Sequence, residues 1–239
     1  MFLLVAIVVG GSLVLSHMLP FPFLLEAFRP SKSLWRMPSP PGVRAIYLTF
    51  DDGPNARWTP AVLDALRDEK ARATFFLIDE HVTDETAPIV RRIAADGHAI
   101  GLHSGSRRPV VMGPDRLAAQ LTRAADRITA ITGTAPCRLF RPHAGWRSAT
   151  MYDALGRLDY RLAGWSWGMW DWSWWRRLDA TSVARRLQRK ASPGDIIVIH
   201  DGHHKDPSKD RAHAAGTVRL LVPALRTQGY QFRSLCERN

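Results

Sequence analysis

The regular alternation of two hydrophobic patterns after residue 44 is the feature that most constrains how this chain can fold. Short apolar runs rich in β-branched and aromatic residues predict strands at 45–50, 73–78, 98–102, 138–140, 160–165, 195–200 and 230–234. Segments with apolar residues three and four positions apart predict helices at 59–68, 87–96, 114–132, 148–158, 181–191 and 217–228. About seven strand–helix units imply a parallel sheet with crossover helices. We expect this α/β chain to form a distorted β/α barrel, and an open doubly wound sheet is the alternative.

The composition supports a folded domain and excludes few classes of function. Apolar residues make up 46% of the 239 residues, enough for a sizeable core. The net charge of +11 comes mainly from scattered arginines, so it suits anionic lipid or a cell-envelope polymer, and we expect no nucleic-acid partner. No GxGxxG, GxxxxGK[ST] or GxSxG motif occurs, which leaves dinucleotide, P-loop and serine-esterase functions without support. The oligomeric state and the pairing of the two cysteines, Cys137 and Cys236, stay open.

The first 25 residues form a hydrophobic segment that we expect to associate with a membrane. No charged side chain occurs from Phe2 to Leu25. A helix up to about Met18 would span roughly 27 Å at 1.5 Å per residue, close to a hydrocarbon thickness of about 30 Å. Because the segment lacks a basic start and a small-x-small cleavage motif, an uncleaved N-terminal anchor is favoured over the signal peptide of a secreted protein.

The same patterns divide the chain into three segments. We expect a membrane anchor or signal segment at 1–25, a proline-containing linker at 26–43 and one domain at 44–236. The orientation of the anchor is open, because the basic residues from Arg29 to Arg44 favour a cytoplasmic domain under the positive-inside rule.

Polar side chains collect where the predicted strands end. They are Asp51 and Asp52 after the first strand of the domain, His103 after the third, Arg141 and His143 after the fourth, and His200 after the sixth. In parallel α/β folds the chemistry lies at these carboxyl ends. Each position alone has an ordinary explanation, since an Asp-Asp turn can cap the next helix and a lone histidine is more often structural. Together they favour metal-assisted hydrolysis, in which one carboxylate binds a metal while its neighbour takes a proton.

Five strings carry a more specific signal. TFDDGP, GHAIGLHS, LFRPHAGW, GWSWGMWDW and IVIHDG, in this order, resemble the motifs of the polysaccharide deacetylases, the NodB-homology family, over about residues 43–235. This resemblance implies a distorted β/α barrel and a divalent metal, usually zinc, with cobalt or nickel as alternatives. It implies a hydrolase that removes acetyl groups from N-acetylated sugars of a peptidoglycan-like or chitin-like glycan. With the N-terminal segment, it leads us to expect a membrane-anchored protein facing the cell envelope.

The resemblance also implies a role for each matching residue. Asp51 would be the general base, Asp52 and His103 metal ligands, Arg141 the residue that holds Asp51, His200 the general acid, Asp171 the residue that orients His200, and Trp172 and Val198 walls of the acetyl pocket. These roles are chemically coherent, because a cation next to Asp51 keeps it ionised and an anion next to His200 raises the pKa of the imidazole.

The second motif departs from the family pattern. Arg107 stands where the family has its second metal-binding histidine, and an arginine is not a usable ligand. His143 stands where a proline is usual, and we expect it to enter the cleft. Ala144 replaces an aromatic residue whose backbone N–H serves the oxyanion hole, a role that survives a change of side chain. His203 and His204 are interpreted as part of a solvated loop.

Two further alternatives follow. The loss of a ligand at Arg107 makes an inactive glycan-binding member of the family the main alternative to an active enzyme.

Six of the nine tryptophans lie within eleven residues, from Trp165 to Trp175. Those beyond the strand could stack on sugar rings or lie at a membrane interface, while Trp165 is expected in the core.

Overall fold

The computed structural model describes residues 2–19, 21–28, 32–168, 171 and 179–236. Within these residues the strands form one sheet in which every ladder pair is parallel. The sheet order is β1-β6-β5-β4-β3-β2-β8-β7, and β9 pairs with β2. The strands are β1 (Ser33–Leu34), β2 (Ala45–Gly53), β3 (Ala73–Ile78), β4 (Ala99–His103), β5 (Leu139–Arg141), β6 (Arg161–Ala163), β7 (Trp167–Gly168), β8 (Ile196–His200) and β9 (Gln231–Phe232).

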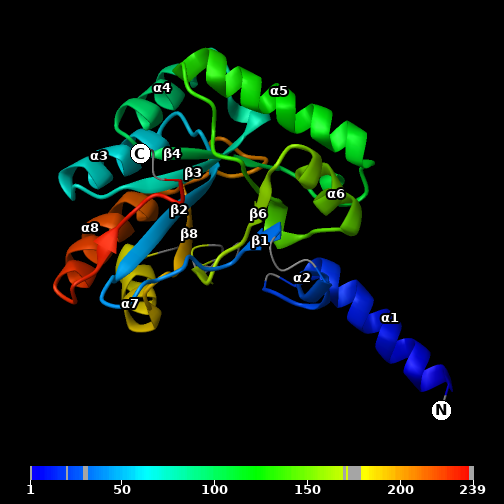
Figure 1. Cartoon of the computed structure of the whole chain (residues 1–239). Helices are drawn as coiled ribbons and strands as arrows, with labels where there is room; N and C mark the ends of the chain where they lie inside the picture. The colour runs from blue at the N-terminus through cyan, green and yellow to red at the C-terminus, as the bar shows by residue number, and fades with distance from the viewer. Residues whose placement is uncertain (1, 20, 29–31, 169–170, 172–178, 237–239) are drawn as a thin grey trace.

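All seven predicted strands are present, and β1 and β7 are additions. Both additional strands are two residues long, too short to show a hydrophobic period in the sequence. The sheet curls into an incomplete barrel, which confirms the predicted barrel-like α/β fold (Figure 1). An antiparallel bridge between Arg36 and Asp195 links the chain after β1 to the chain before β8.

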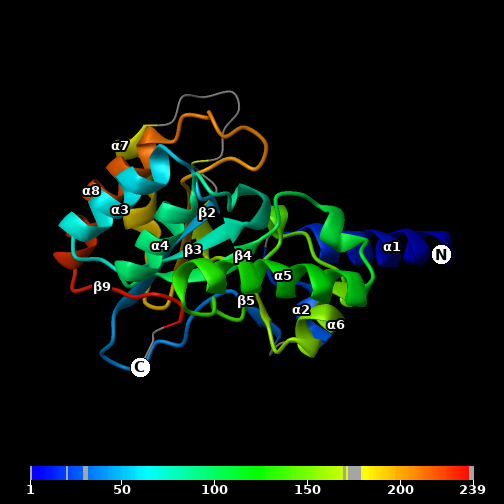
Figure 2. The ribbon, with the colours of Figure 1, turned by 90° about the horizontal axis from the view of Figure 1, so that it is seen from above.

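Helices cover the outside of the sheet (Figures 1 and 2). They are α3 (Trp58–Asp68), α4 (Ala87–Ala95), α5 (Pro114–Thr132), α6 (Ala149–Arg157), α7 (Ala180–Lys190) and α8 (Ala212–Arg226). Each matches a predicted helix, although α8 starts five residues earlier than expected. The helices are amphipathic: in α3, for example, Val62, Leu63 and Leu66 are fully buried while Arg67 lies in solvent.

The alternation along β2 decides which side chains face the concave side of the sheet. Ile46, Leu48 and Phe50 belong to the core cluster shared with the helices. Tyr47 belongs to a second cluster built from strands and connecting segments, with no helix residue. Because successive residues of a strand face opposite sides, Asp51 lies on the same face as Tyr47 and points into the curl of the sheet.

The N-terminal residues form two helices before the sheet begins, α1 (Phe2–Met18) and α2 (Leu24–Phe28). Figures 1 and 2 show α1 extending away from the domain. Its outer part is apolar and exposed, with Leu4 at 68% and Ile7 at 62% of full exposure. Among the described helices, none combines the length and the hydrophobicity needed to cross a membrane.

A buried ion pair attaches this N-terminal region to the domain. The fully buried Arg147 donates hydrogen bonds to the carbonyl of Phe21 at 2.8 Å and to Glu26 Oε2 at 2.9 Å. Tyr152 donates to the other oxygen of Glu26 at 2.9 Å, and its hydroxyl lies 2.7 Å from Ser33 Oγ. Residues 26–43, predicted to be a linker, therefore contribute a buried carboxylate and strand β1 to the packed structure. The proline signals gave no indication of this, because the ion-pair partner lies more than a hundred residues away.

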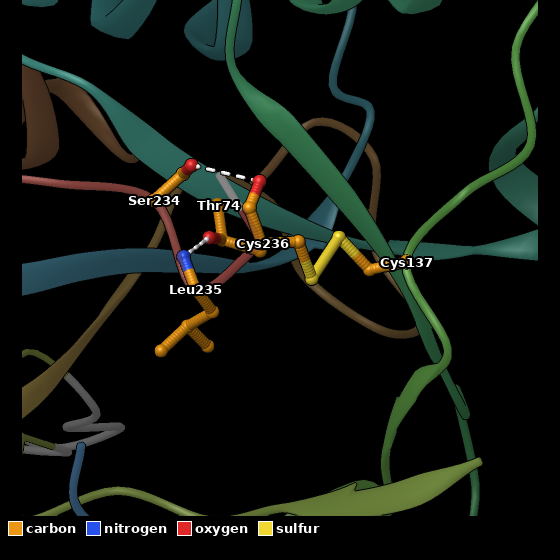
Figure 3. The surroundings of a disulfide bond; sticks show 5 residues. All are labelled: Thr74, Cys137, Ser234, Leu235 and Cys236. Carbon is orange, nitrogen blue, oxygen red and sulfur yellow. Dashed lines mark hydrogen bonds between the residues drawn. A yellow bond between two sulfur atoms is a disulfide. The ribbon is translucent and has the colours of Figure 1, made fainter. Parts of the chain in front are cut away.

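The two cysteines form a disulfide (Figure 3). Cys137 precedes β5 and Cys236 follows β9, at a sequence separation of 99. Beside it, the backbone N–H of Leu235 donates to Thr74 Oγ1 at 2.9 Å. The bond thus fastens the C-terminal tail at the amino ends of β3 and β5, and it answers the pairing question that the sequence left open.

Candidate active site

The sheet order brings the predicted site residues together at the carboxyl ends of four strands. In the parallel register, Asp51 of β2 pairs with His200 of β8, and His103 of β4 pairs with Arg141 of β5. These strand ends open into a cleft of about 580 Å³. Its lining includes Asp51, Asp52, His103, Arg107, His143, Ala144, Trp165, Val198, His200 and His204.

Asp51 and Arg141 form a buried ion pair beneath the cleft. Arg141 Nη1 donates to Asp51 Oδ1 at 2.6 Å and to Thr49 Oγ1 at 2.7 Å, while Nη2 donates to the carbonyl of Gly164 at 2.8 Å. Arg141 has no exposed surface and Asp51 is 3% exposed. Because a buried carboxylate without a partner is unfavourable, the guanidinium supplies the partner that Asp51 needs at this depth.

Asp52 and His103 face each other across a short gap. His103 Nε2 lies 3.3 Å from Asp52 Oδ1, and both side chains are buried. His103 Nδ1 lies 2.7 Å from the carbonyl oxygen of Arg141, which only accepts hydrogen bonds, so Nδ1 carries a proton. In the neutral imidazole, Nε2 then presents a lone pair to Asp52.

This arrangement fits a metal ion. Oδ1 of Asp52 is buried, and no described residue donates a hydrogen bond to it. A carboxylate oxygen and an imidazole lone pair that face each other need a cation between them, and both are ordinary zinc or cobalt ligands. Without a metal, a second proton on His103 supplies the positive charge between the imidazole and the Asp52 carboxylate. Although burial opposes it, the carboxylates of Asp51 and Asp52 accordingly raise the pKa of His103.

Two further histidines reach the same part of the cleft. Asp52, His143 and His204 each offer a ligand atom, and the three atoms lie within 4.8 Å of one another. His143 therefore enters the cleft as expected, whereas His204 lines it instead of belonging to a solvated loop. Burial is the main cause that lowers the pKa of His143 to about 4, and burial also lowers the pKa of His204.

Arg107 lies on the rim of the cleft. Its guanidinium stacks over the ring of Trp146, 4.4 Å from the ring centroid. The side chain is exposed and keeps its charge in contact with solvent. The motif position at which the third metal ligand is expected is therefore occupied by a cation, Arg107, that stacks on the ring of Trp146.

His200 and Asp171 form the second buried pair of the site. His200 Nδ1 lies 3.0 Å from Asp171 Oδ1, and the backbone N–H of His200 donates to Asp171 Oδ2 at 2.5 Å. Burial disfavours the imidazolium, but the Asp171 carboxylate outweighs it, and the pKa of His200 rises to about 9. His200 is thus a cation at neutral pH, with its Nδ1 proton directed at Asp171.

Two further residues lie next to this pair: the sequence already places Asp201 at the end of the same strand as His200, whereas sequence reasoning missed His213. His213, on α8, places Nε2 3.5 Å from Asp171 Oδ2. Asp201 is fully buried, accepts a hydrogen bond from Thr59 Oγ1 at 2.5 Å, and has a pKa that burial raises to about 7. Asp201 was visible in the IVIHDG string, whereas a histidine on a helix face carries no signal of its own.

Only part of the hydrophobic wall predicted for the cleft lies within the described residues. Val198 and Trp165 are buried and line the cleft. Trp165 therefore belongs both to the core, as expected, and to the cleft wall. Trp172, predicted to wall the acetyl pocket, and most of the tryptophan cluster beyond Trp167 lie outside the described residues.

Comparisons with known proteins agree with this site. Residues 39–163 match the family model described as polysaccharide deacetylase. A peptidoglycan-N-acetylglucosamine deacetylase of Bacillus cereus is 30% identical over 203 residues, which cover 85% of this chain and 91% of the relative.

Solved structures show the same fold. The Bc1960 peptidoglycan N-acetylglucosamine deacetylase superposes with a TM-score of 0.77 at 26% identity, covering 90% of this chain and 95% of that one. A family 4 acetyl xylan esterase from Clostridium thermocellum, in complex with a cobalt ion, gives a TM-score of 0.69 at 30% identity, covering 80% of this chain and 88% of that one.

Proposed function

We propose that this chain, which belongs to the polysaccharide deacetylase family, is a metal-dependent hydrolase that removes acetyl groups from N-acetylated sugars of a glycan. The observation that carries the proposal is the placement of an arginine-held carboxylate, Asp51, next to an imidazolium, His200, at the ends of adjacent strands in one cleft. Cleavage of an acetamide needs a base for water and an acid for the leaving amine, and this pair supplies both.

The residues of the site divide the work. Asp51, held in place by Arg141, accepts a proton from the attacking water. His200, kept protonated by Asp171, donates a proton to the sugar nitrogen as the C–N bond breaks, so that acetate and a free amine result. A divalent metal bound at Asp52 and His103 would supply the Lewis acidity that activates water and polarises the acetyl carbonyl. We infer zinc as this metal, with cobalt or nickel as alternatives.

The cleft also suits the substrate. Val198 and Trp165 present an apolar wall against which an acetyl methyl group can pack, with Trp172 expected beside them. Ala144 lies at the rim in a left-handed backbone conformation, φ +53°, and its backbone N–H is our candidate for the oxyanion donor. A peptidoglycan-like or chitin-like polymer is the substrate that fits the family resemblance.

Acetate release tests this function. We expect the purified, metal-loaded protein to release acetate from N-acetylglucosamine oligomers or from peptidoglycan, and Asp51→Asn to abolish release. Asp159→Asn, a change at an exposed position before β6 and thus at the opposite end of the strands, is the matched control and should leave the rate unchanged. Release of acetate from acetylated xylan but from no N-acetylated glycan would show an ester-specific enzyme instead, and an unchanged rate in Asp51→Asn would remove that residue from its role.

The second candidate function is glycan binding without catalysis. It is favoured by one observation, the replacement of a metal-binding histidine by Arg107, which stacks on Trp146 at the rim. A protein of this kind would bind chitin oligomers in calorimetry, with the same affinity in the presence of a chelator, and release no acetate.

We further propose that α1 associates with a membrane and that the domain faces the cell envelope. Support comes from the exposed apolar surface of α1 and from the Cys137–Cys236 disulfide, which is typical of an oxidising compartment. Flotation of the full chain with anionic vesicles, lost on deletion of residues 2–18, is the expected result. Equal flotation of the deletion variant would show that another surface binds lipid.

A further inference from the structure

The incomplete metal motif poses a specific chemical problem. Asp52 and His103 are two protein ligands, and the residue four positions after His103 is Arg107, whose guanidinium stays protonated and stacks on Trp146. Catalytic zinc sites ordinarily have three protein ligands and an open position. Two ligands alone hold a cation weakly, so the proposed function requires another donor in the cleft.

Two loops of this chain bring histidines to that place. His143 lies in the short helix η4 (His143–Gly145) after β5, and His204 lies in the loop after β8. Ligand atoms of Asp52, His143 and His204 lie within 4.8 Å of one another. In a tetrahedral site with metal–ligand bonds of about 2.1 Å, ligand atoms are about 3.4 Å apart. Small side-chain rotations therefore suffice to close the three groups around one ion.

The surrounding contacts hold His143 near this position. Its backbone N–H donates to Ser104 Oγ at 2.8 Å, which fixes the loop to the residue that follows His103. The imidazole rings of His143 and His204 lie 4.5 Å apart between centroids, so the two loops meet at these side chains. His203 stacks on the other side of His204, with the centroids 4.6 Å apart, but is not part of the ligand group.

We propose that His143 and His204 take the place of the missing motif histidine, so that the metal ion is bound by the three-residue group Asp52, His143 and His204, beside His103, with a fourth position open. The site is thereby shifted from the motif loop after β4 to the loops after β5 and β8. This inference rests on the proposed function for the presence of a metal, but it is tested by metal binding alone.

The test is a titration of the untagged full chain with Zn²⁺ or Co²⁺ in competition with a chelator. We expect one ion per chain, and a loss of affinity of at least about tenfold in His143→Ala and in His204→Ala, because removing even an outer-shell partner costs 10- to 100-fold. The visible spectrum of bound Co²⁺ should change in both variants. His203→Ala, from the same loop, is the matched control and should bind like the wild type.

A reciprocal variant guards against loss of folding. Arg107→His should change the affinity of the wild type little, because the ligand set is already complete, but should restore binding in the double variant His143→Ala/His204→Ala. Wild-type affinity in His143→Ala/His204→Ala without the Arg107→His change would overturn the inference. Metal binding that depends on both histidines, without acetate release, would support the inference and reject the proposed function. Acetate release together with metal binding that does not depend on these histidines would support the proposed function and reject the inference.

Discussion

Asp51 Oδ1 lies 2.6 Å from Arg141 Nη1, and neither side chain has more than a trace of exposed surface. The arginine also bonds to Thr49 and to backbone carbonyls of residues 163 and 164, so it is held independently of the aspartate. The proposed base thus lies in a preformed site. This geometry makes catalysis and stability depend on the same pair.

The first prediction separates these two effects. Arg141→Met should lower the free energy of unfolding by about 3–5 kcal/mol, because it leaves Asp51 buried and unpaired. The double variant Asp51→Asn/Arg141→Met should recover part of that loss while remaining inactive. Urea denaturation measures the stability, and acetate release measures activity. Equal stability of the single and double variants would show that the carboxylate is not the source of the penalty.

The second prediction concerns pH. The pKa of His200 is raised from its ordinary 6.5 to about 9, mainly by Asp171 acting against burial. A raised histidine pKa contributes stability that is fully present below about pH 6.5 and is lost as the pH rises through about 9. In metal-free protein, Asp171→Asn should therefore lower the melting temperature most near pH 6 and least near pH 10. A difference that stays constant over this range would mean that the pair does not titrate as described.

The strands and helices of the domain could be predicted because their buried residues form regular hydrophobic patterns in the sequence. Phe50, Phe75 and Ile199 are all fully buried, and such runs leave a clear signal. Strands β1 and β7 could not be predicted, since two residues carry no period and their pairing depends on neighbours distant in sequence. The contact of Glu26 with Arg147 was missed for the same reason.

The site was predictable where its residues end strands. Asp51 and His200 are in register on adjacent strands, and His103 lies two residues further along β4, so the order of the strands brings the three residues to the same edge of the sheet. His204 lies in a loop and His213 lies on a helix, and in neither place does the position in the sequence determine where the side chain points. The sequence indicates that a ligand is missing at Arg107, but only the structure shows that His143 and His204 lie close to Asp52.

The third prediction concerns the disulfide. Cys137→Ser/Cys236→Ser should lower stability by about 2–5 kcal/mol, because the bond closes a loop of 99 residues in the unfolded chain. For a chain of this size, that corresponds to a fall in melting temperature of roughly 5–15 °C. Acetate release at 20 °C should be unchanged, since the bond lies at the amino ends of the strands. A melting temperature unaffected by the double substitution would contradict this account.

The fourth prediction concerns the attachment of the N-terminal region. Arg147→Met removes the only described side-chain cation that contacts Glu26 and leaves a buried carboxylate. We expect residues 21–28 to become accessible to protease in this variant, with a loss of stability of about 3–5 kcal/mol. Arg157→Met, which removes an exposed ion pair with Asp115, is the control and should cost less than about 1 kcal/mol. Equal protease resistance in both variants would show that other contacts hold the region.

The last prediction tests the backbone that positions the proposed ligand Asp52. A Cβ at Gly202 would overlap the carbonyl group of Asp52, which is backbone and cannot rotate away. Asp52 itself has φ +70°, an uncommon backbone conformation for a residue with a side chain, and we expect this close approach of the β8 loop to hold it in place. Gly202→Ala should therefore weaken Zn²⁺ binding at least about tenfold and reduce acetate release, even though no ligand is changed. Gly113→Ala is the matched control, because a Cβ there meets no atom within 4 Å and the backbone angle is ordinary. Circular dichroism confirms that both variants fold; if the two then bind Zn²⁺ equally, the position of Asp52 does not depend on Gly202.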